Sequence, residues 1–168
     1  MTLATIILAL VSAQRFGELV LARRNTLALL AQGAREIAPS HYSALVALHA
    51  AWLAALWLWG YDATVNLPLL AVFVVLQALR VWVIATLGPR WTTRIIILPG
   101  APLVASGPYR YFSHPNYMVV VAEIAVLPLA LGLVWVALAF TVLNALMLIV
   151  RLRSENLWLA DARISGQR

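Results

Sequence analysis

The feature that most constrains this chain is an apolar run of 33 residues, 118–150, in which Glu123 is the only charged residue. As a single helix this run would be roughly 50 Å long at 1.5 Å per residue, which is too long for one crossing of a hydrocarbon core of about 30 Å. Pro128 and Gly132 lie near its middle, and both residue types interrupt helices. The run therefore predicts a helical hairpin with arms at residues 117–127 and 134–150.

Three more apolar runs precede the hairpin, at residues 3–21, 42–59 and 67–87. Hydrophobic residues make up 64% of the chain and charged residues 11%, and the mean hydropathy is +0.91, whereas about a quarter of residues are charged in soluble domains. We therefore expect an all-α integral membrane protein with five transmembrane helices, forming one domain over residues 1–168. The first run could instead be a leader cleaved near residues 11–13, but no positive charge precedes it.

The basic residues predict the topology. All twelve are Arg, and most fall in three polar segments: the segment 22–41, the central loop between the third run and the hairpin, and the tail from residue 151. We expect the segment 22–41 to be a loop, with a short interfacial helix near residues 27–31 as an option. The turns near Gly60 and Pro128 carry no Arg, so the positive-inside rule places all three Arg-bearing segments in the cytoplasm and the N-terminus outside.

The central loop is where the sequence concentrates polar chemistry. Residues 99–117 contain four Pro and two Gly, which predict an ordered, turn-rich segment rather than a helix. The same stretch carries Arg110, His114, Asn116 and three Tyr between two membrane-embedded arms. It is therefore a candidate cofactor-binding loop, and the alternative is a plain connector.

Charged residues inside the spans need partners. Arg15 and Glu18 are three residues apart, so they share a helix face and can neutralise each other near the membrane boundary. Arg80 lies within the third run. It either faces protein or a water-filled cavity, or its long side chain extends to the nearer interface, and the sequence leaves both possibilities open.

Several functional classes are disfavoured. The chain has no Cys, which excludes disulfides, thiolate metal ligands and a Cys nucleophile. The scattered Arg residues do not form the basic patch of a nucleic-acid-binding protein, and the His and acidic residues lack metal-ligand spacing, so we expect no metal site. What remains is a set of polar residues on the cytoplasmic side: Arg94, Tyr109, Arg110, His114, Asn116, Tyr117, Glu123, Arg151 and Glu155.

A family resemblance follows from the motifs. The stretch G-P-Y-R-Y-F-S-H-P-N-Y (107–117), then an apolar hairpin and R-x-R-x-E-x-x-x-L from Arg151, resembles the isoprenylcysteine carboxyl methyltransferase family. Segments A-Q-R-F-G-E-L from Ala13, R-N-x-L-x-L-L-A-Q-G-A-R-E from Arg24, H-Y-S-A-L-V-A-L-H from His41 and L-R-V-W-V-I-A-T-L-G-P-R-W-T-T-R from Leu79 are similar to its short bacterial members. The resemblance covers nearly the whole chain.

The resemblance implies a membrane methyltransferase that uses S-adenosylmethionine, in a bacterial cell membrane with its active site on the cytoplasmic side. The acceptor would be a lipophilic small molecule, prenylcysteine-like or an alkylpyrone-type polyketide, methylated on a carboxylate or acidic hydroxyl, with O-methylation favoured. Arg151 would take the catalytic, substrate-facing role. The family's cofactor contacts would fall on Leu103, Val104, Tyr109, His114, Pro115, Asn116, Tyr117 and Glu155.

This chain departs from the family pattern at Ser113, where Arg is usual, at Val119, where Gly is frequent, and at Asn156, where a second Glu is common. These departures bear mainly on acceptor identity. Arg151 and Glu155 are four residues apart and share a helix face, so they could also form a plain solvent-exposed pair.

Two other functions compete with the methyltransferase. An NADPH-dependent sterol reductase shares the H-P-N-Y stretch but ends in a Tyr-Gly motif that this tail lacks, and a non-enzymatic membrane subunit or transporter leaves the polar loop without a role.

Overall fold

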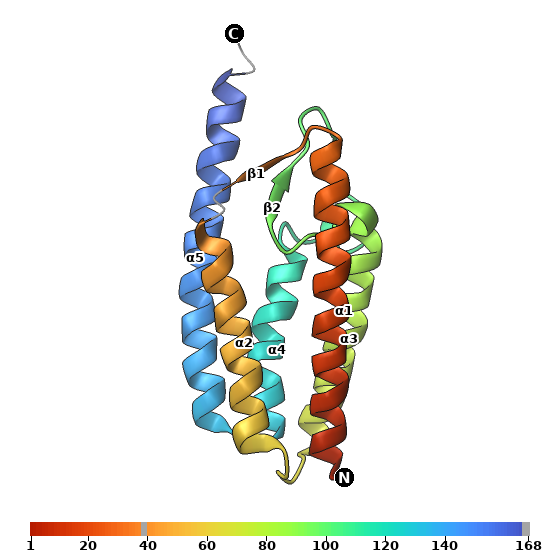
Figure 1. The fold of residues 1–168 in the computed structure, drawn as a ribbon, viewed down its shortest axis with the longest axis vertical. Helices are drawn as coiled ribbons and strands as arrows, with labels where there is room; N and C mark the ends of the chain where they lie inside the picture. The colour runs from red at the N-terminus through yellow and green to blue at the C-terminus, as the bar shows by residue number, and fades with distance from the viewer. Residues whose placement is uncertain (38–39, 166–168) are drawn as a thin grey trace.

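The computed structural model describes the backbone of residues 1–37 and 40–165, and the side chains of residues 1–37 and 42–153. Within this part, five α-helices run side by side along the long axis of the molecule (Figure 1). They are α1 (Leu3–Ala31), α2 (Ser40–Gly60), α3 (Leu67–Leu87), α4 (Pro115–Ala130) and α5 (Val134–Ser165). The helical membrane architecture predicted from the sequence is confirmed.

The number of crossings is confirmed only in part. Helices α1, α2, α3 and α5 are long and apolar enough to span a bilayer. Helix α4 has 16 residues, about 24 Å at 1.5 Å per residue, which is less than the hydrocarbon core of about 30 Å. Four of the five predicted spans are thus found by length and composition, and α4 as the fifth stays a prediction.

One end of the bundle holds the N-terminus and two tight connections, and we call it the turn end (Figure 1). The hydroxyls of Thr2 and Thr5 both donate to the carbonyl of Tyr61 at 2.7 Å, which joins α1 to the α2–α3 connection. The amide of Asn66 donates to the carbonyl of Ala130 at 2.8 Å, which joins that connection to the α4–α5 turn. The three segments therefore close the turn end together.

The predicted hairpin break is confirmed. Helix α4 ends at Ala130, and Gly132 follows with a φ of +73°, a conformation that L side chains rarely adopt. The amide of Leu133 then donates to the carbonyl of Pro128 at 2.8 Å. Helix α5 starts one residue later and runs antiparallel to α4.

The first helix is longer than predicted. The segment 22–31, expected as a loop, continues α1 without a break to Ala31. Its buried residues Ala22, Asn25, Thr26 and Leu29 follow a helical spacing while Arg23 and Arg24 are exposed. The Asn25 amide nitrogen donates to the carbonyls of Trp91 at 2.8 Å and Gly88 at 3.2 Å, which holds this extension against the rest of the protein.

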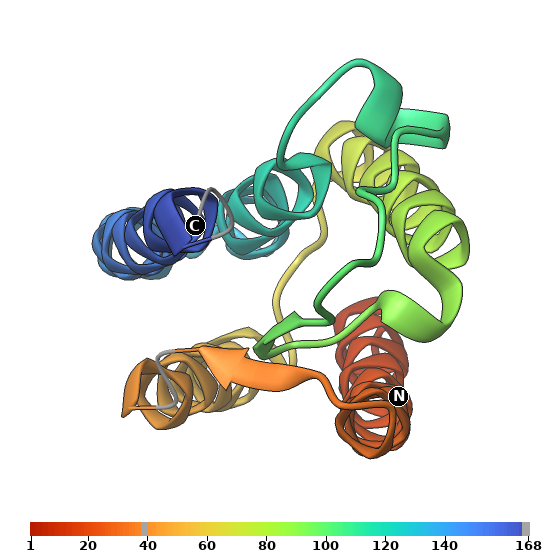
Figure 2. The same cartoon turned by 90° about the horizontal axis from the view of Figure 1, so that it is seen from above.

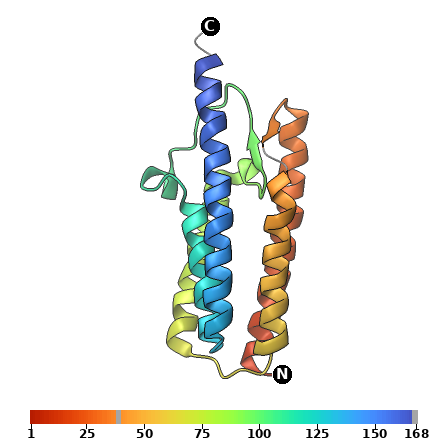
Figure 3. The ribbon, with the colours of Figure 1, turned by 90° about the vertical axis from the view of Figure 1, so that its left-hand side faces the viewer.

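The opposite end, the loop end, carries two short strands that the sequence reading did not predict. Strand β1 (Arg35–Ile37) pairs antiparallel with β2 (Ile95–Ile97), and each has three residues, too few to show a strand pattern. Viewed from this end, β1 passes from α1 toward α2 across the bundle (Figure 2). Helix α5 extends beyond the other elements here (Figure 3).

The central loop is turn-rich, as expected, and it leans on α3. It contains the 3-10 helix η2 (Gly107–Arg110), and a second one, η1 (Gly88–Arg90), directly follows α3. Gly107 approaches α3 so closely that a Cβ atom would lie 2.6 Å from the Thr86 hydroxyl and 3.3 Å from the Trp82 indole nitrogen. Only glycine fits at this contact, which places η2 beside α3.

The apolar core fills the half of the bundle nearest the turn end. Buried side chains of α1, α2, α3 and α4 meet there, with Leu8, Leu56 and Leu127 fully enclosed. Because lipid is as apolar as these side chains, close packing and polar contacts must supply the affinity between helices. The ion pairs between helices lie in the other half, toward the loop end.

Candidate functional site

A cavity of about 380 Å³ lies on the loop-end side of the apolar core. Its walls come from α1, α2, α4 and α5, while Arg80 of α3 and residues 91–93 after η1 complete the lining. The volume is in the range of small-molecule sites, about 300 to 1,000 Å³.

The cavity has an apolar side that reaches the outer surface of the bundle. Phe16 and Leu19 of α1 line it although they are 70% and 42% exposed, and Ala50 of α2 lines it and is also exposed. In Figure 1, α4 is visible between α1 and α2. On helices that cross a bilayer, exposed apolar residues face lipid, so the cavity has a lipid-facing mouth between α1 and α2.

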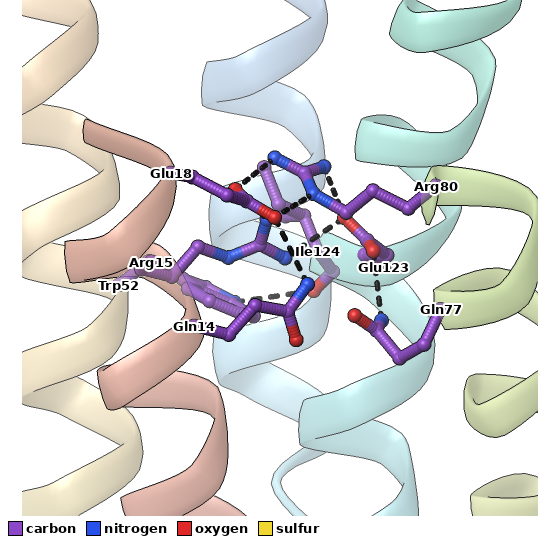
Figure 4. Close-up of polar contacts among 8 residues, drawn as sticks. All are labelled: Gln14, Arg15, Glu18, Trp52, Gln77, Arg80, Glu123 and Ile124. Atoms are coloured by element: carbon purple, nitrogen blue, oxygen red, sulfur yellow. Dashed lines mark hydrogen bonds and ion pairs between the residues drawn. The ribbon is translucent and has the colours of Figure 1, made fainter. Parts of the chain in front are cut away.

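Four charged side chains form a cluster that we call the charge tetrad: Arg15, Glu18, Arg80 and Glu123 (Figure 4). The first three line the cavity, and Glu123 is buried behind them. The Arg80 guanidinium donates to both carboxylate oxygens of Glu18 at 2.6 Å and to Glu123 at 2.8 Å. Arg15 reaches the same two acids, Glu18 at 3.0 Å and Glu123 at 2.9 Å. The tetrad therefore joins α1, α3 and α4.

Two side-chain amides donate hydrogen bonds to the acids of the tetrad. Gln14 donates to Glu18 at 2.9 Å, and Gln77 donates to Glu123 at 2.7 Å. With two Arg and two Glu the cluster carries no net charge, which is the condition under which ionised groups persist within a membrane. The open question on Arg80 is thereby answered: its side chain is buried and faces protein rather than the interface.

At the loop end of the cavity, Arg151 of α5 is fixed by two bonds. Its Nε donates to the Tyr117 hydroxyl at 2.9 Å, and its Nη1 donates to the Thr93 carbonyl at 2.9 Å. The guanidinium carbon also lies 5.5 Å from the centre of the Tyr117 ring. The hairpin and the central loop thus hold one cation at the edge of the cavity.

The central loop enters α4 through a stacked pair. His114 precedes the first residue of α4, and its ring lies parallel to that of Tyr117, with centroids 5.2 Å apart. Pro115 begins the helix and is buried, while Asn116 lines the cavity with its side-chain oxygen lacking a partner among the described residues. Proline suits the first helical turn because its missing N–H has no helical acceptor there.

A second cation lies beside Arg151. Arg94 donates to Glu36 at 2.6 Å, and its guanidinium carbon is 4.0 Å from the centre of the Tyr42 ring. Tyr42 in turn shares a hydrogen bond of 3.2 Å with the Thr93 hydroxyl. These contacts join the β1–β2 ribbon to Tyr42 and Thr93, which line the loop end of the cavity.

The structure brings some of the predicted site residues together and leaves others apart. Asn116, Tyr117 and Arg151 line the cavity, and His114 stacks on Tyr117. Three predicted contacts in the loop do not line the cavity: Leu103, which is 89% exposed, Val104, and Tyr109, which belongs to η2 beside α3. The backbone of Glu155 belongs to α5, but its side chain is outside the described residues.

Sequence reasoning passed over several polar residues of the cavity wall, among them one each on α2 and α5. His49 lines it from α2 and Asn144 lines it from α5. The available signal was a lone polar residue inside an otherwise apolar span, which in membrane proteins marks an inward-facing position.

Among the side chains that the structure describes, His, Asp and Glu do not gather in groups of three or more at metal-binding separation.

A bundle of membrane-spanning helices around a mostly apolar cavity with a few charged and polar groups in its wall is typical of membrane proteins that handle lipophilic small molecules. Comparison with known proteins gives the family. Residues 69–161 match the isoprenylcysteine carboxyl methyltransferase family, and this chain belongs to it.

Two relatives align along almost the full length. The "Uncharacterized protein YpbQ" of Bacillus subtilis is 33% identical over 156 residues, covering 90% of this chain and 93% of the relative. An "Uncharacterized protein" of Haemophilus influenzae is 28% identical over 163 residues, covering 93% of this chain and 94% of the relative. No solved structure matches the chain.

Family membership makes this protein a membrane methyltransferase by class. It favours that reading over the reductase and the non-enzymatic subunit that the sequence alone left open.

Proposed function

We propose that this protein transfers a methyl group from S-adenosylmethionine to a carboxylate or acidic hydroxyl of a lipophilic acceptor. The observation that carries the proposal is the placement of Arg151, fixed by Tyr117 and Thr93 at the edge of a cavity that opens toward lipid. Its Nη2 has no partner among the described residues and can donate to an oxyanion. Guanidinium groups bind such anions with charge-assisted, geometrically specific hydrogen bonds.

The residues at the loop end fit the cofactor. S-adenosylmethionine carries a sulfonium, an ammonium, a carboxylate and an adenine, so its site needs an aromatic or acidic surface and hydrogen-bonding groups. The His114–Tyr117 stack supplies aromatic surface, and the Asn116 oxygen is an acceptor without a partner in the part of the protein that the structure describes. Glu155 is one helical turn beyond Arg151 on α5, and we propose that it binds the ammonium or sulfonium.

The loop residues complete this proposal. Leu103, Val104 and Tyr109 remain proposed cofactor contacts from the resemblance alone, because they do not line the cavity. Pro115 contributes by starting α4 where Asn116 and Tyr117 face the cavity.

Methyl transfer depends mainly on positioning the acceptor oxygen next to the methyl group. When bound, the cofactor supplies an electrophilic methyl carbon. The acceptor oxygen would displace S-adenosylhomocysteine from that carbon. Charge would be lost on reaching the transition state, so a poorly hydrated site would favour the reaction. Arg151 holds the oxyanion in place, and the surrounding helices exclude water. A carboxylate or acidic hydroxyl is already ionised near neutral pH, so no strong general base is required.

We further propose five crossings, with α4 as the short fifth one, the N-terminus outside and the loop end in the cytoplasm. The Arg residues of the loop end support this orientation, since Arg23, Arg24, Arg90 and Arg94 all lie there. In a bacterial cell membrane this puts the cofactor site on the side where S-adenosylmethionine is made.

A labelled-methyl assay tests the proposed function. Membranes containing the protein are incubated with S-adenosylmethionine labelled in its methyl group, and the products are partitioned between organic solvent and water. We expect label in lipid-soluble products. If these products are methyl esters, base hydrolysis should release the label. Label confined to water-soluble products, or no transfer above membranes lacking the protein, would contradict the proposal.

A further inference from the structure

Asn144 carries an amide in the cavity wall that is unpaired among the described residues. Its side chain is fully buried, it lines the cavity from α5, and neither its nitrogen nor its oxygen has a hydrogen-bond partner among the described residues. A buried amide without partners costs roughly 1 to 3 kcal/mol for each unpaired group, so native proteins rarely keep one without a reason. The Asn144 amide is therefore a donor and an acceptor held ready for a ligand or for water.

His49 adds an acceptor on the facing wall. Its Nδ1 lies 2.9 Å from the Leu45 carbonyl, and a carbonyl can only accept, so Nδ1 carries the proton of the neutral ring. The Nε2 atom is then an acceptor, and it has no hydrogen-bond partner among the residues that the structure describes. Because His49 lines the same cavity from α2, one ligand in this cavity can lie beside both His49 and Asn144.

The position of Asn144 relative to Arg151 sets the shape of a ligand that reaches both. They are seven residues apart on α5, which is two helical turns on one face and about 10 Å along the axis. Allowing about 3 Å for a hydrogen bond at each end, the two polar groups of the ligand must be several atoms apart. One carboxylate cannot contact both residues.

We propose that the wall formed by Asn144 and His49 is a second polar binding site for the acceptor, selecting lipids whose head carries a donor–acceptor group beyond the reacting oxygen. An amide or a hydroxyl-bearing ring meets this requirement, since it can donate to His49 Nε2 or the Asn144 oxygen and accept from the Asn144 nitrogen. A simple fatty or prenyl acid leaves these groups unpaired. The inference rests on the proposed function in that Arg151 holds the reacting oxygen.

The competing explanation is ordered water. A cavity of this size has room for water beside the polar groups of its wall, and water bonds to otherwise unpaired buried groups. Water alone would give no preference between acceptors that differ only in the second polar group.

Two matched probes separate the explanations. Para-(acylamino)benzoic acid carries a carboxylate and, across the ring, an amide that leads into the chain, while para-alkylbenzoic acid of equal chain length replaces that amide with methylenes. Equilibrium binding to purified protein is measured by quenching of tryptophan fluorescence with brominated chains, because Trp52 and Trp91 line the cavity. Methyl transfer to each probe is measured in parallel.

The variants are Asn144→Leu, which has similar volume and no polar group, and His49→Phe. The matched control is Thr141→Val on the same helix. The Thr141 hydroxyl is also buried and has no partner among the described side chains and backbone, but it does not line the cavity. Melting temperature in detergent identifies variants that fail to fold.

We expect the wild type and Thr141→Val to bind and methylate the amide probe about tenfold better than the alkyl probe, and Asn144→Leu and His49→Phe to reduce this ratio toward one. Equal handling of both probes by the wild type, or an unchanged ratio in folded Asn144→Leu, overturns the second site and leaves the proposed function intact. Tighter binding of the amide probe that depends on Asn144, without any methyl transfer, supports the second site and contradicts the proposed function.

Discussion

Arg80 of α3 and Glu18 of α1 form a two-pronged ion pair, with Nε to Oε1 and Nη2 to Oε2 both at 2.6 Å. The remaining Arg80 nitrogen, Nη1, donates to Glu123 of α4 at 2.8 Å. One guanidinium therefore connects three helices at the level of the cavity, where the surrounding lipid offers no alternative partner for a charge.

Arg80→Met should destabilise the protein strongly. The change leaves two buried carboxylates facing a single Arg15, and removing one partner from a buried ion pair typically costs about 3 to 5 kcal/mol. The free energy of unfolding in mixed detergent micelles measures the loss.

The matched control for this change is Arg24→Met, because Arg24 is exposed on α1. We expect it to alter stability by less than about 0.5 kcal/mol, as surface substitutions usually do. Adding Glu18→Gln to Arg80→Met should recover part of the loss, since the two residues interact directly. Equal effects of Arg80→Met and Arg24→Met would show that the tetrad does not stabilise the bundle.

The sequence predicted the tetrad only in pieces. Spacing along one helix indicates that Arg15 and Glu18 share a face, and composition indicates that Arg80 needs a partner. The pairing of Arg80 with Glu18 and Glu123 spans 62 and 43 residues. Such pairing depends on how the helices pack, and no periodicity within one helix encodes it.

The bounds of the helices and strands also separate into those that local sequence predicts and those that depend on contacts between distant segments. The third span was predicted with its observed bounds, because an Asn66 cap precedes it and Gly88 follows it. The prediction ended the first helix too early, because the polar residues Arg23 and Arg24 indicated a loop. The buried face of α1 continues past them. The three-residue strands are fixed by contacts between distant segments and carry no local signal.

For the candidate site, motifs identified Asn116, Tyr117 and Arg151, which the fold places around one cavity. The motifs could not reveal that the loop's 3-10 helix leans on α3, away from the cavity, because a single close contact at Gly107 decides that.

Ala50→Trp should obstruct acceptor entry. Ala50 lines the cavity at its lipid-facing side, so a large ring there fills the mouth between α1 and α2. We expect the KM for a lipophilic acceptor to rise about tenfold while affinity for S-adenosylhomocysteine is unchanged. Ala51→Trp is the control, since Ala51 is exposed but does not line the cavity. If both variants behave as wild type, the acceptor enters elsewhere.

Tyr117→Phe should release Arg151. The phenolic oxygen accepts the Nε–H bond at 2.9 Å, and a hydrogen bond to a charged group is worth about 1.5 to 3 kcal/mol. We expect kcat/KM for the acceptor to fall roughly tenfold to a hundredfold. Tyr111→Phe, on an exposed residue of the same loop, should leave kcat/KM unchanged. Full activity in Tyr117→Phe would mean that Arg151 needs no such support.

A reporter fused after Arg168 tests the proposed orientation. Helix α5 extends from the loop end, so a cytoplasmic loop end predicts a cytoplasmic C-terminus. A fusion that is active only in the cytoplasm should fluoresce, and an alkaline phosphatase fusion at the same point should be inactive. The reverse result would place the proposed cofactor site outside the cell.

The central claim is that the loop end binds S-adenosylmethionine beside Arg151. Isothermal titration of detergent-purified protein with S-adenosylhomocysteine tests it most directly, with NADPH as the comparison ligand. Glu155→Gln should weaken binding roughly tenfold to a hundredfold, as loss of a charge-assisted contact does, while Asp161→Asn, on the same helix, should not. Arg151→Ala should keep cofactor affinity and lose turnover. The account predicts saturable one-to-one binding of S-adenosylhomocysteine and none of NADPH, whereas binding of NADPH alone, or of neither ligand by folded protein, would contradict it.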